Sequence, residues 1–152
     1  MIERIDHVNL VVGDMQPMLA FYRDLLGLRL TKQATIRGPW IEAITGLAQA
    51  EADVVFLEAP AGPRIELIRY RTPDRPRPSA LGDPNTKGLR HIALRVTDLD
   101  VLVASLRRSG VELLSEIQQV PAAQVDYADQ RKRLVYCLDP EGNLLELCAF
   151  ES

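Results

Sequence analysis

Residues 5–15, IDHVNLVVGDM, are repeated further along the chain as LRHIALRVTDL at residues 89–99. The eleven aligned positions contain four identities, which are His7/His91, Leu10/Leu94, Val12/Val96 and Asp14/Asp98. Self-similarity at a fixed distance along a chain indicates a duplicated structural unit. The chain has only two histidines, so the repeat makes them equivalent to each other.

A second pair of segments extends the repeat over almost the whole chain. Residues 54–70, VVFLEAPAGPRIELIRY, align without a gap with residues 134–150, LVYCLDPEGNLLELCAF. The identities are Val55/Val135, Pro60/Pro140, Gly62/Gly142, Glu66/Glu146 and Leu67/Leu147, and aromatic residues match at Phe56/Tyr136 and Tyr70/Phe150. The sequence therefore consists of two related half-units.

The sequence pattern of each half-unit predicts a strand, a helix and three further strands. Residues 4–12 alternate as a strand, and Asp14 is a typical helix N-cap, whose carboxylate accepts from free backbone amides. Gly27 is expected to end that helix, as Gly110 ends the helix that Asp98 caps in the second half. The remaining strands are predicted at about residues 28–36 and 112–119, and as hairpins around the Pro/Gly turns of residues 54–70 and 134–150.

The expected organisation is one α+β domain over residues 1–152, made of half-units 1–71 and 88–152. The connector between them, residues 72–87, is rich in proline and has no periodic apolar pattern. Residues 39–50 and 121–132 have no counterpart in the other half, so we interpret them as insertions that serve the site.

Composition excludes several classes of protein. A chain with 47% hydrophobic and 26% charged residues is globular, and its net charge of −3 argues against nucleic acid as a partner. Cys137 and Cys148 lie in apolar runs and are expected to be small buried hydrophobes. The N-terminus lacks the pattern of a signal peptide and no apolar run reaches the length of a membrane span, so we expect a cytoplasmic protein that binds no membrane.

Strand alternation places four polar side chains on one kind of face. His7 and His91 point away from the apolar side of their strands, and Glu66 and Glu146 share their faces with apolar neighbours. For any one of the four alone, a hydrogen-bonded histidine or a solvated glutamate is the better interpretation. That interpretation gives no reason for the repeat to match His with His and Glu with Glu. Nitrogen and oxygen donors together suit Zn, Ni, Co, Mn or Fe, so the sequence predicts a divalent metal site.

These residues resemble the metal positions of a known family. His7 in DHVNLVVGDM, Glu66 in RIELIRY, His91 in GLRHIALRVTDLD and Glu146 in DPEGNLLEL are similar, in order, to the four metal positions of the vicinal oxygen chelate superfamily. The superfamily includes glyoxalase I, methylmalonyl-CoA epimerase, extradiol dioxygenases and proteins of fosfomycin and bleomycin resistance. The resemblance implies two βαβββ modules whose mixed sheets curl around a metal-centred cavity, a metal that holds two adjacent substrate oxygens, and a homodimer.

Three classes of function are open at this point. The favoured one is a metal-dependent lyase or isomerase of the glyoxalase or epimerase type, which enolises a small 2-oxo or α-acyl thiol conjugate. In that reaction the metal stabilises negative charge on the substrate oxygens, and Glu66 or Glu146 acts as the base for the α-proton. The second class is an Fe(II) extradiol-type dioxygenase for a catechol-like substrate, with His7, His91 and Glu146 as ligands. The third is a non-catalytic binder of a drug or other small molecule, and the presence of all four metal positions argues against it.

A third carboxylate is a candidate catalytic residue by resemblance. In methylmalonyl-CoA epimerases the second metal position is often Gln, so Glu66 is a departure that leaves the substrate open. Those epimerases also carry a base after their second strand, and Glu42 lies near that place in this chain. The alternative, which the sequence slightly favours, is that Glu42 is solvated in the first turn of a short helix.

The two unpaired segments offer further candidates. Trp40 and Tyr127 either line the cavity or merely cover it. Arg131, Lys132 and Arg133 either meet a phosphate or carboxylate of the substrate or form a solvated turn before the strand RLVYCL. The sequence favours the solvated turn.

Overall fold

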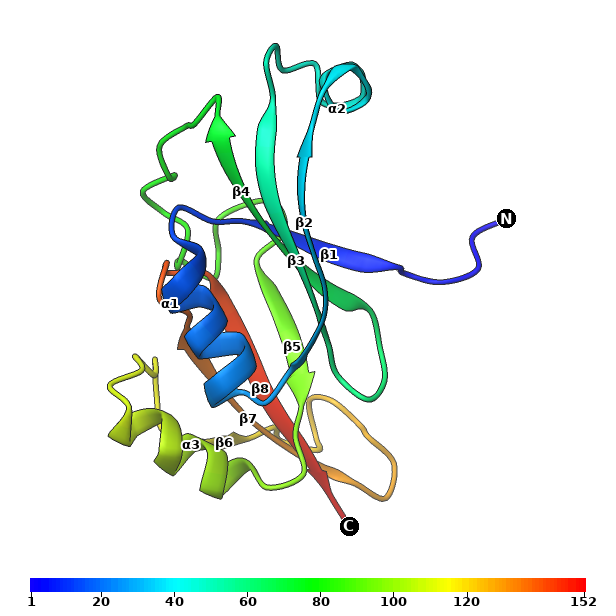
Figure 1. Ribbon diagram of the computed structural model, residues 1–152. Helices are drawn as coiled ribbons and strands as arrows, with labels where there is room; N and C mark the ends of the chain where they lie inside the picture. The colour runs from blue at the N-terminus through cyan, green and yellow to red at the C-terminus, as the bar shows by residue number, and fades with distance from the viewer. The chain divides into compact units, whose positions relative to one another are not determined.

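A mixed four-stranded sheet forms the first unit of the chain, Met1–Pro76, in the computed structural model, which describes residues 1–152 (Figure 1). Its strands are β1 (His7–Val11), β2 (Arg29–Arg37), β3 (Glu51–Glu58) and β4 (Arg64–Thr72). They lie in the order β1-β4-β3-β2, with β1 parallel to β4 and the other neighbours antiparallel. The first strand therefore lies beside the last one of its unit.

The second unit, Arg77–Ser152, has the same topology. Its strands are β5 (His91–Arg95), β6 (Gln118–Gln119), β7 (Arg131–Leu138) and β8 (Leu144–Glu151), in the order β5-β8-β7-β6. Strand β5 is again parallel to β8, and the pairs β7/β8 and β6/β7 are antiparallel. The predicted α+β class and its two related modules are confirmed.

A capped helix follows the first strand of each unit, as the sequence predicts. Asp14 accepts from the amide of Gln16 at 3.0 Å to begin α1 (Met15–Leu19), which continues as a π-helical segment, η1 (Ala20–Leu25). Asp98 accepts from the amide of Val101 at 3.1 Å to begin α3 (Leu99–Arg108). Both helices end at a glycine of positive φ, Gly27 at 76° and Gly110 at 77°, a conformation that favours glycine.

The strand predicted at residues 112–119 is wrong in its extent. Only the two residues of β6 and an isolated bridge between Leu113 and Cys137 pair with β7. Ser115 Oγ donates to the carbonyl of Glu116 at 2.8 Å, and Gln118 Nε2 contacts the same carbonyl at 3.3 Å. Such local side-chain hydrogen bonds compete with a sheet ladder, so the segment pairs only briefly, whereas its counterpart β2 pairs with β3 along Arg29–Arg37 with one irregularity.

The segments without a counterpart differ from each other. Residues 39–50 contain a short helix, α2 (Pro39–Thr45), which begins with proline and ends at Gly46. Residues 121–130 form turns only, and so do the residues between β4 and β5. The turn favoured for Arg131–Arg133 is wrong, because β7 begins at Arg131 and these three residues pair with β8.

Both cysteines are buried, which confirms their expected role as small hydrophobic residues. Burial raises the pKa of the Cys137 thiol to about 12 and also raises the pKa of Cys148. No helix of the chain combines the length and apolar character that a membrane crossing requires.

Candidate metal centre

In the first unit, the pairing of β1 with β4 brings a histidine beside a glutamate. Asn9 is the register partner of Glu66, and His7 lies two residues before Asn9 on the same face. The Nε2 atom of His7 is 3.6 Å from Oε2 of Glu66. Asn9 Nδ2 donates to that same oxygen at 2.7 Å and so orients the carboxylate.

Asp6 sets the orientation of the His7 ring. The Nδ1 atom of His7 is 2.9 Å from Oδ2 of Asp6, and because a carboxylate only accepts, Nδ1 carries the proton. Arg64 contacts the same Asp6 oxygen, and the hydrogen bonds from His7 and Arg64 hold the pKa of Asp6 below its usual range. With its proton on Nδ1, the neutral form of His7 would present the lone pair of Nε2 toward Glu66.

The second unit repeats this arrangement with a different partner for its glutamate. Ala93 is the register partner of Glu146, and the Nε2 atom of His91 is 3.5 Å from Oε2 of Glu146. The Glu146 side chain is 7% exposed, whereas that of Glu66 is 16% exposed. Lys132 Nζ lies 2.5 Å from the other oxygen, Oε1, as an ion pair outside hydrogen-bond angles.

Two opposing effects act on the pKa of the Lys132 ammonium. Burial acts to lower the pKa of Lys132, but its short ion pair with Glu146 outweighs this effect, so the pKa is raised. Glu146 thus contacts the Lys132 ammonium through one carboxylate oxygen and the His91 ring through the other.

An aromatic ring completes each His–Glu pair. Phe56 is the register partner of Glu66, and its ring packs edge-on against His7 at 5.8 Å between centroids. Tyr136 is the register partner of Glu146, and its ring lies 5.3 Å from that of His91. Each unit thus builds the same group of histidine, glutamate and aromatic residue from equivalent strands.

The donors suit a divalent cation, although neither unit alone supplies a full set of ligands. The structure brings His7 to Glu66 and His91 to Glu146, and no group of three or more His, Cys, Asp or Glu side chains within either unit can hold a metal. In a neutral His7, a lone pair faces a carboxylate oxygen across 3.6 Å without a proton between them. A cation between this lone pair and the carboxylate oxygen would stabilise both. In addition, a metal-bound histidine usually has a carboxylate on its other ring nitrogen, as His7 has Asp6.

The remaining predicted residues lie outside these pairs. Glu42 is half-buried in the first turn of α2, and its Oε1 accepts from the amide of Gln49 at 3.0 Å. Trp40, on the same helix, is 55% exposed. Tyr127 packs edge-on against Phe150 at 5.4 Å between ring centroids. Glu42 thus has a local structural role, and its catalytic role stays a prediction.

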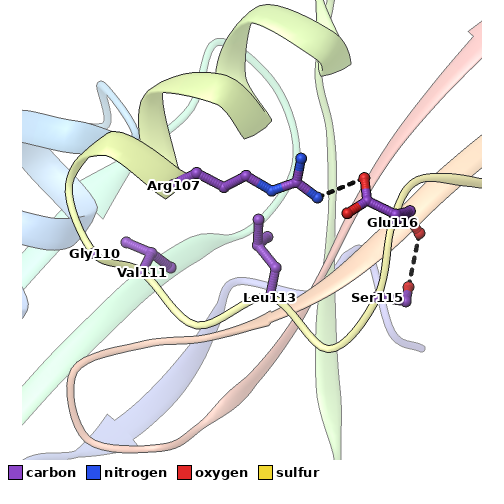
Figure 2. A pocket seen from close by; sticks show the side chains of 6 residues that line it. All are labelled: Arg107, Gly110, Val111, Leu113, Ser115 and Glu116. Carbon is purple, nitrogen blue, oxygen red and sulfur yellow. Dashed lines mark hydrogen bonds and ion pairs between the residues drawn. The ribbon is translucent and has the colours of Figure 1, made fainter.

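A pocket beside α3 contains none of these residues. It is lined by Arg107, Gly110, Val111, Leu113, Ser115 and Glu116 (Figure 2). The Arg107 side chain reaches across it to Glu116, at 2.7 Å between Nη2 and Oε2. Its one cation is therefore already neutralised.

Three residues around the pairs were missed in the sequence, and a fourth, Lys132, was considered only as a substrate contact or part of a solvated turn. Asp6 precedes β1, so its side chain is free of strand alternation and turns back to the adjacent His7. Asn9 could have been found, because alternation places it on the face of His7. Lys132 could also have been found by continuing the alternation of β7 back from Tyr136, had the three basic residues not suggested a turn. Arg64 gave no signal of its own.

The matches with known proteins agree with this fold. The family model of the Glyoxalase/Bleomycin resistance protein/Dioxygenase superfamily matches residues 4–147, so the chain belongs to that superfamily. The chain is 30% identical over 148 residues to the YaeR protein of Escherichia coli (strain K12), covering 96% of this chain and 95% of that one. The crystal structure of a glyoxalase family protein from Bacillus cereus is 29% identical, with a TM-score of 0.85 over 100% of this chain and 97% of that one.

An enzyme is among the relatives. The chain is 24% identical over 119 residues to mitochondrial methylmalonyl-CoA epimerase of Mus musculus. This match covers 78% of the chain but spans only about 60% of the length of the epimerase.

Proposed function

We propose that the chain is a metal-dependent enzyme of the glyoxalase or epimerase type, which enolises a small 2-oxo or α-acyl substrate carried as a thiol conjugate. The observation that supports this is the matched pair of His–Glu contacts, 3.6 Å in one unit and 3.5 Å in the other. If these four side chains were merely solvated, there would be no reason for the same His–Glu contact to occur in both units. The relationship to an epimerase supports the reaction type.

His7, Glu66, His91 and Glu146 are the proposed ligands of one divalent metal ion. When bound, such an ion polarises a substrate carbonyl as a Lewis acid and stabilises the negative charge that develops there. Asp6 holds His7 in the tautomer that exposes Nε2, and Asn9 orients Glu66.

The glutamates are also the proposed bases for the α-proton. Each lies beside an imidazole, and a positioned base contributes about 10²–10⁴-fold to the rate. Glu66 has only the neutral Asn9 as a hydrogen-bond partner, whereas Glu146 is paired with the cation Lys132. Since Lys132 already occupies one oxygen of Glu146, Glu66 is the preferred candidate for the base.

Metal analysis of the purified protein tests the site. We expect one divalent ion per chain in the wild type and none in His91→Ala or Glu146→Ala. Glu42→Gln is the matched control, because Glu42 lies on α2 and contacts neither pair. Full metal content in both His91→Ala and Glu146→Ala would end the proposal.

Proton exchange tests the reaction. In heavy water, the metal-loaded wild type should exchange the α-proton of methylmalonyl-CoA or isomerise the thiol adduct of a 2-oxoaldehyde. Glu66→Gln should retain metal but lose about 10²-fold or more in rate, whereas an unchanged rate removes Glu66 from the role of base. Oxygen uptake with catechols and Fe(II) would instead identify the dioxygenase class.

A mixing experiment tells whether the two pairs come from one chain or from two copies in a homodimer. His7→Ala and His91→Ala are each expected to lack metal. If sites form between copies, unfolding and refolding the two variants together restores some sites, because an intact His7 of one chain meets an intact His91 of the other. If sites form within a chain, no metal returns.

A further inference from the structure

Two cations in the second unit flank one aromatic ring. Arg95 at the end of β5 places its guanidinium carbon 4.6 Å from the centroid of the Phe150 ring. Lys132 at the start of β7 places Nζ 5.9 Å from the same centroid and 5.8 Å from that of Tyr127. Both cations are therefore concentrated around Phe150.

This cluster lies on the face that carries the candidate ligands. Arg95 and His91 alternate on one face of β5, and Phe150 and Glu146 on one face of β8. Lys132 is the register partner of Phe150, and its Nζ reaches Glu146 Oε1. Lys132 is thus an immediate neighbour of the proposed metal ligand Glu146, and Arg95 lies on the other strand beside β8, against the Phe150 ring.

The two cations are departures from the repeat. The repeat matches Arg95 with Val11, and strand register, which extends the match beyond the aligned sequence, places Ala52 where Lys132 lies in the second unit. Ala52 is the register partner of Tyr70, as Lys132 is of Phe150, and it belongs to an apolar cluster with Val54 and Ile68. The first unit shows that the fold at these positions does not need charge.

Neighbouring arginines of β7 point elsewhere and are already paired. Arg133 binds Asp100 and Glu151, each at 2.7 to 2.8 Å, and Arg131 donates to the carbonyl of Ser152 at 3.3 Å. In contrast, the side chain of Arg95 makes no hydrogen bond or ion pair, and the one ring it contacts is that of Phe150. Five donors of an exposed guanidinium are therefore open to a ligand.

Lys132 also lacks a full set of partners. Its side chain is 15% exposed, and burying a cation is costly unless anions surround it. Glu146 is its one carboxylate, and it is shared with His91. A second anion beside Lys132 would therefore be stabilised.

We propose that Arg95 and Lys132 form a binding site for a small oxyanion, a carboxylate or phosphate group of the substrate. Arginine binds such groups with two parallel hydrogen bonds, and lysine contributes a point charge. The identity of the bound molecule as substrate rests on the proposed function, but anion binding itself needs only these residues of the second unit.

The test uses the metal-free full chain, so that it does not depend on the metal site. Malonate and inorganic phosphate are titrated separately at constant ionic strength, and binding is followed by chemical-shift changes of backbone amides. The wild type should show saturable shifts around β5, β7 and β8, and the tighter of the two probes identifies the group. Arg95→Leu and Lys132→Met should each weaken binding by about tenfold or more, as expected for the loss of a charge-assisted contact.

Arg108→Leu is the matched control, because it removes one positive charge from the exposed end of α3 and should leave binding unchanged. Absence of saturable binding in the wild type, or binding by Arg95→Leu equal to that of the wild type, overturns the proposal. Arg95→Leu should also keep the wild-type metal content, since Arg95 contacts none of the four ligands. Loss of anion binding with normal metal content thus separates this proposal from the metal site.

Discussion

Asp6 is an exposed residue, yet its carboxylate orients the ring of His7. It fixes the proton of His7 on Nδ1 and is itself held by Arg64. We predict that Asp6→Asn lowers metal affinity by about 10–100-fold, the usual cost of removing the carboxylate behind a metal-bound histidine. Titration calorimetry with Ni²⁺ or Zn²⁺ measures this change.

The control for Asp6→Asn is Asp24→Asn, which breaks a surface pair with Arg23 away from β1. It should bind metal as the wild type does. Equal affinity of Asp6→Asn and wild type would show that Asp6 does not position His7.

The Cys137 thiol should be inert while the protein is folded. Burial raises its pKa to about 12, above the ordinary value of 9.0, so at about pH 8 almost no thiolate is present. We predict that a thiol reagent modifies Cys137 only after denaturant is added, which mass spectrometry of the labelled protein detects. Rapid labelling of the native chain would contradict this.

The same shift gives the pH dependence of stability. A raised pKa of Cys137 stabilises the folded state fully below the unfolded value of 9.0, and this contribution falls as the pH rises from 9.0 toward about 12. Cys137→Ala should therefore show a smaller loss of stability over that range than the wild type does. Urea unfolding at several pH values measures the difference.

Among the elements, those specified by local sequence were predictable. Asp14 and Asp98 cap their helices as expected, because a capping carboxylate acts within three residues of itself. The extent of β6 was not predictable, because Ser115 and Gln118 satisfy the Glu116 carbonyl locally in place of the sheet. Lys132 lies beside Glu146 because β7 pairs with β8. Its three consecutive basic residues instead suggested a solvated turn, so this pairing was not predicted.

Helix α3 offers a direct test of packing. Leu99, Val103 and Leu106 form its buried side, whereas Val101 is 63% exposed. We predict that Leu106→Ala lowers the free energy of unfolding by about 2–5 kcal/mol, because it leaves a cavity, whereas Val101→Ala changes it by less than about 0.5 kcal/mol. Similar effects of the two substitutions would mean that α3 does not pack through this side.

For the whole molecule, the repeat specified the topology of both units and paired each histidine with its glutamate. Sequence reasoning reached His7, Glu66, His91 and Glu146 through strand alternation, and the structure places them two by two. It could not supply Asp6 or Arg64, whose contacts depend on how the chain enters β1. It could have separated Lys132 from Arg131 and Arg133 by alternation from Tyr136, but the three consecutive basic residues suggested a turn instead of a strand.

Each unit provides only one His–Glu pair, so the loss of either pair should remove the whole stabilisation that metal gives to the chain. We predict that metal at 100 times its dissociation constant raises the free energy of unfolding of the wild type by about 2.7 kcal/mol. His7→Ala and His91→Ala should each lose this stabilisation entirely, which thermal unfolding with and without metal measures. Half the stabilisation in either variant would mean that each unit binds its own ion.

The difference between the two halves at Arg95 and Lys132 has a stereochemical consequence. In the proposed metal site, the matching His–Glu pairs would offer similar donors to either end of a bound molecule, and a neutral substrate would then have two possible directions. The cations of the two units lie at different positions, since Arg95 and Lys132 are beside Phe150 in the second unit and Lys32 and Arg64 are beside Phe56 in the first. Under the proposed function, an anionic substrate would therefore distinguish its two ends and bind in one direction, so the two enantiomers of a chiral substrate would bind differently.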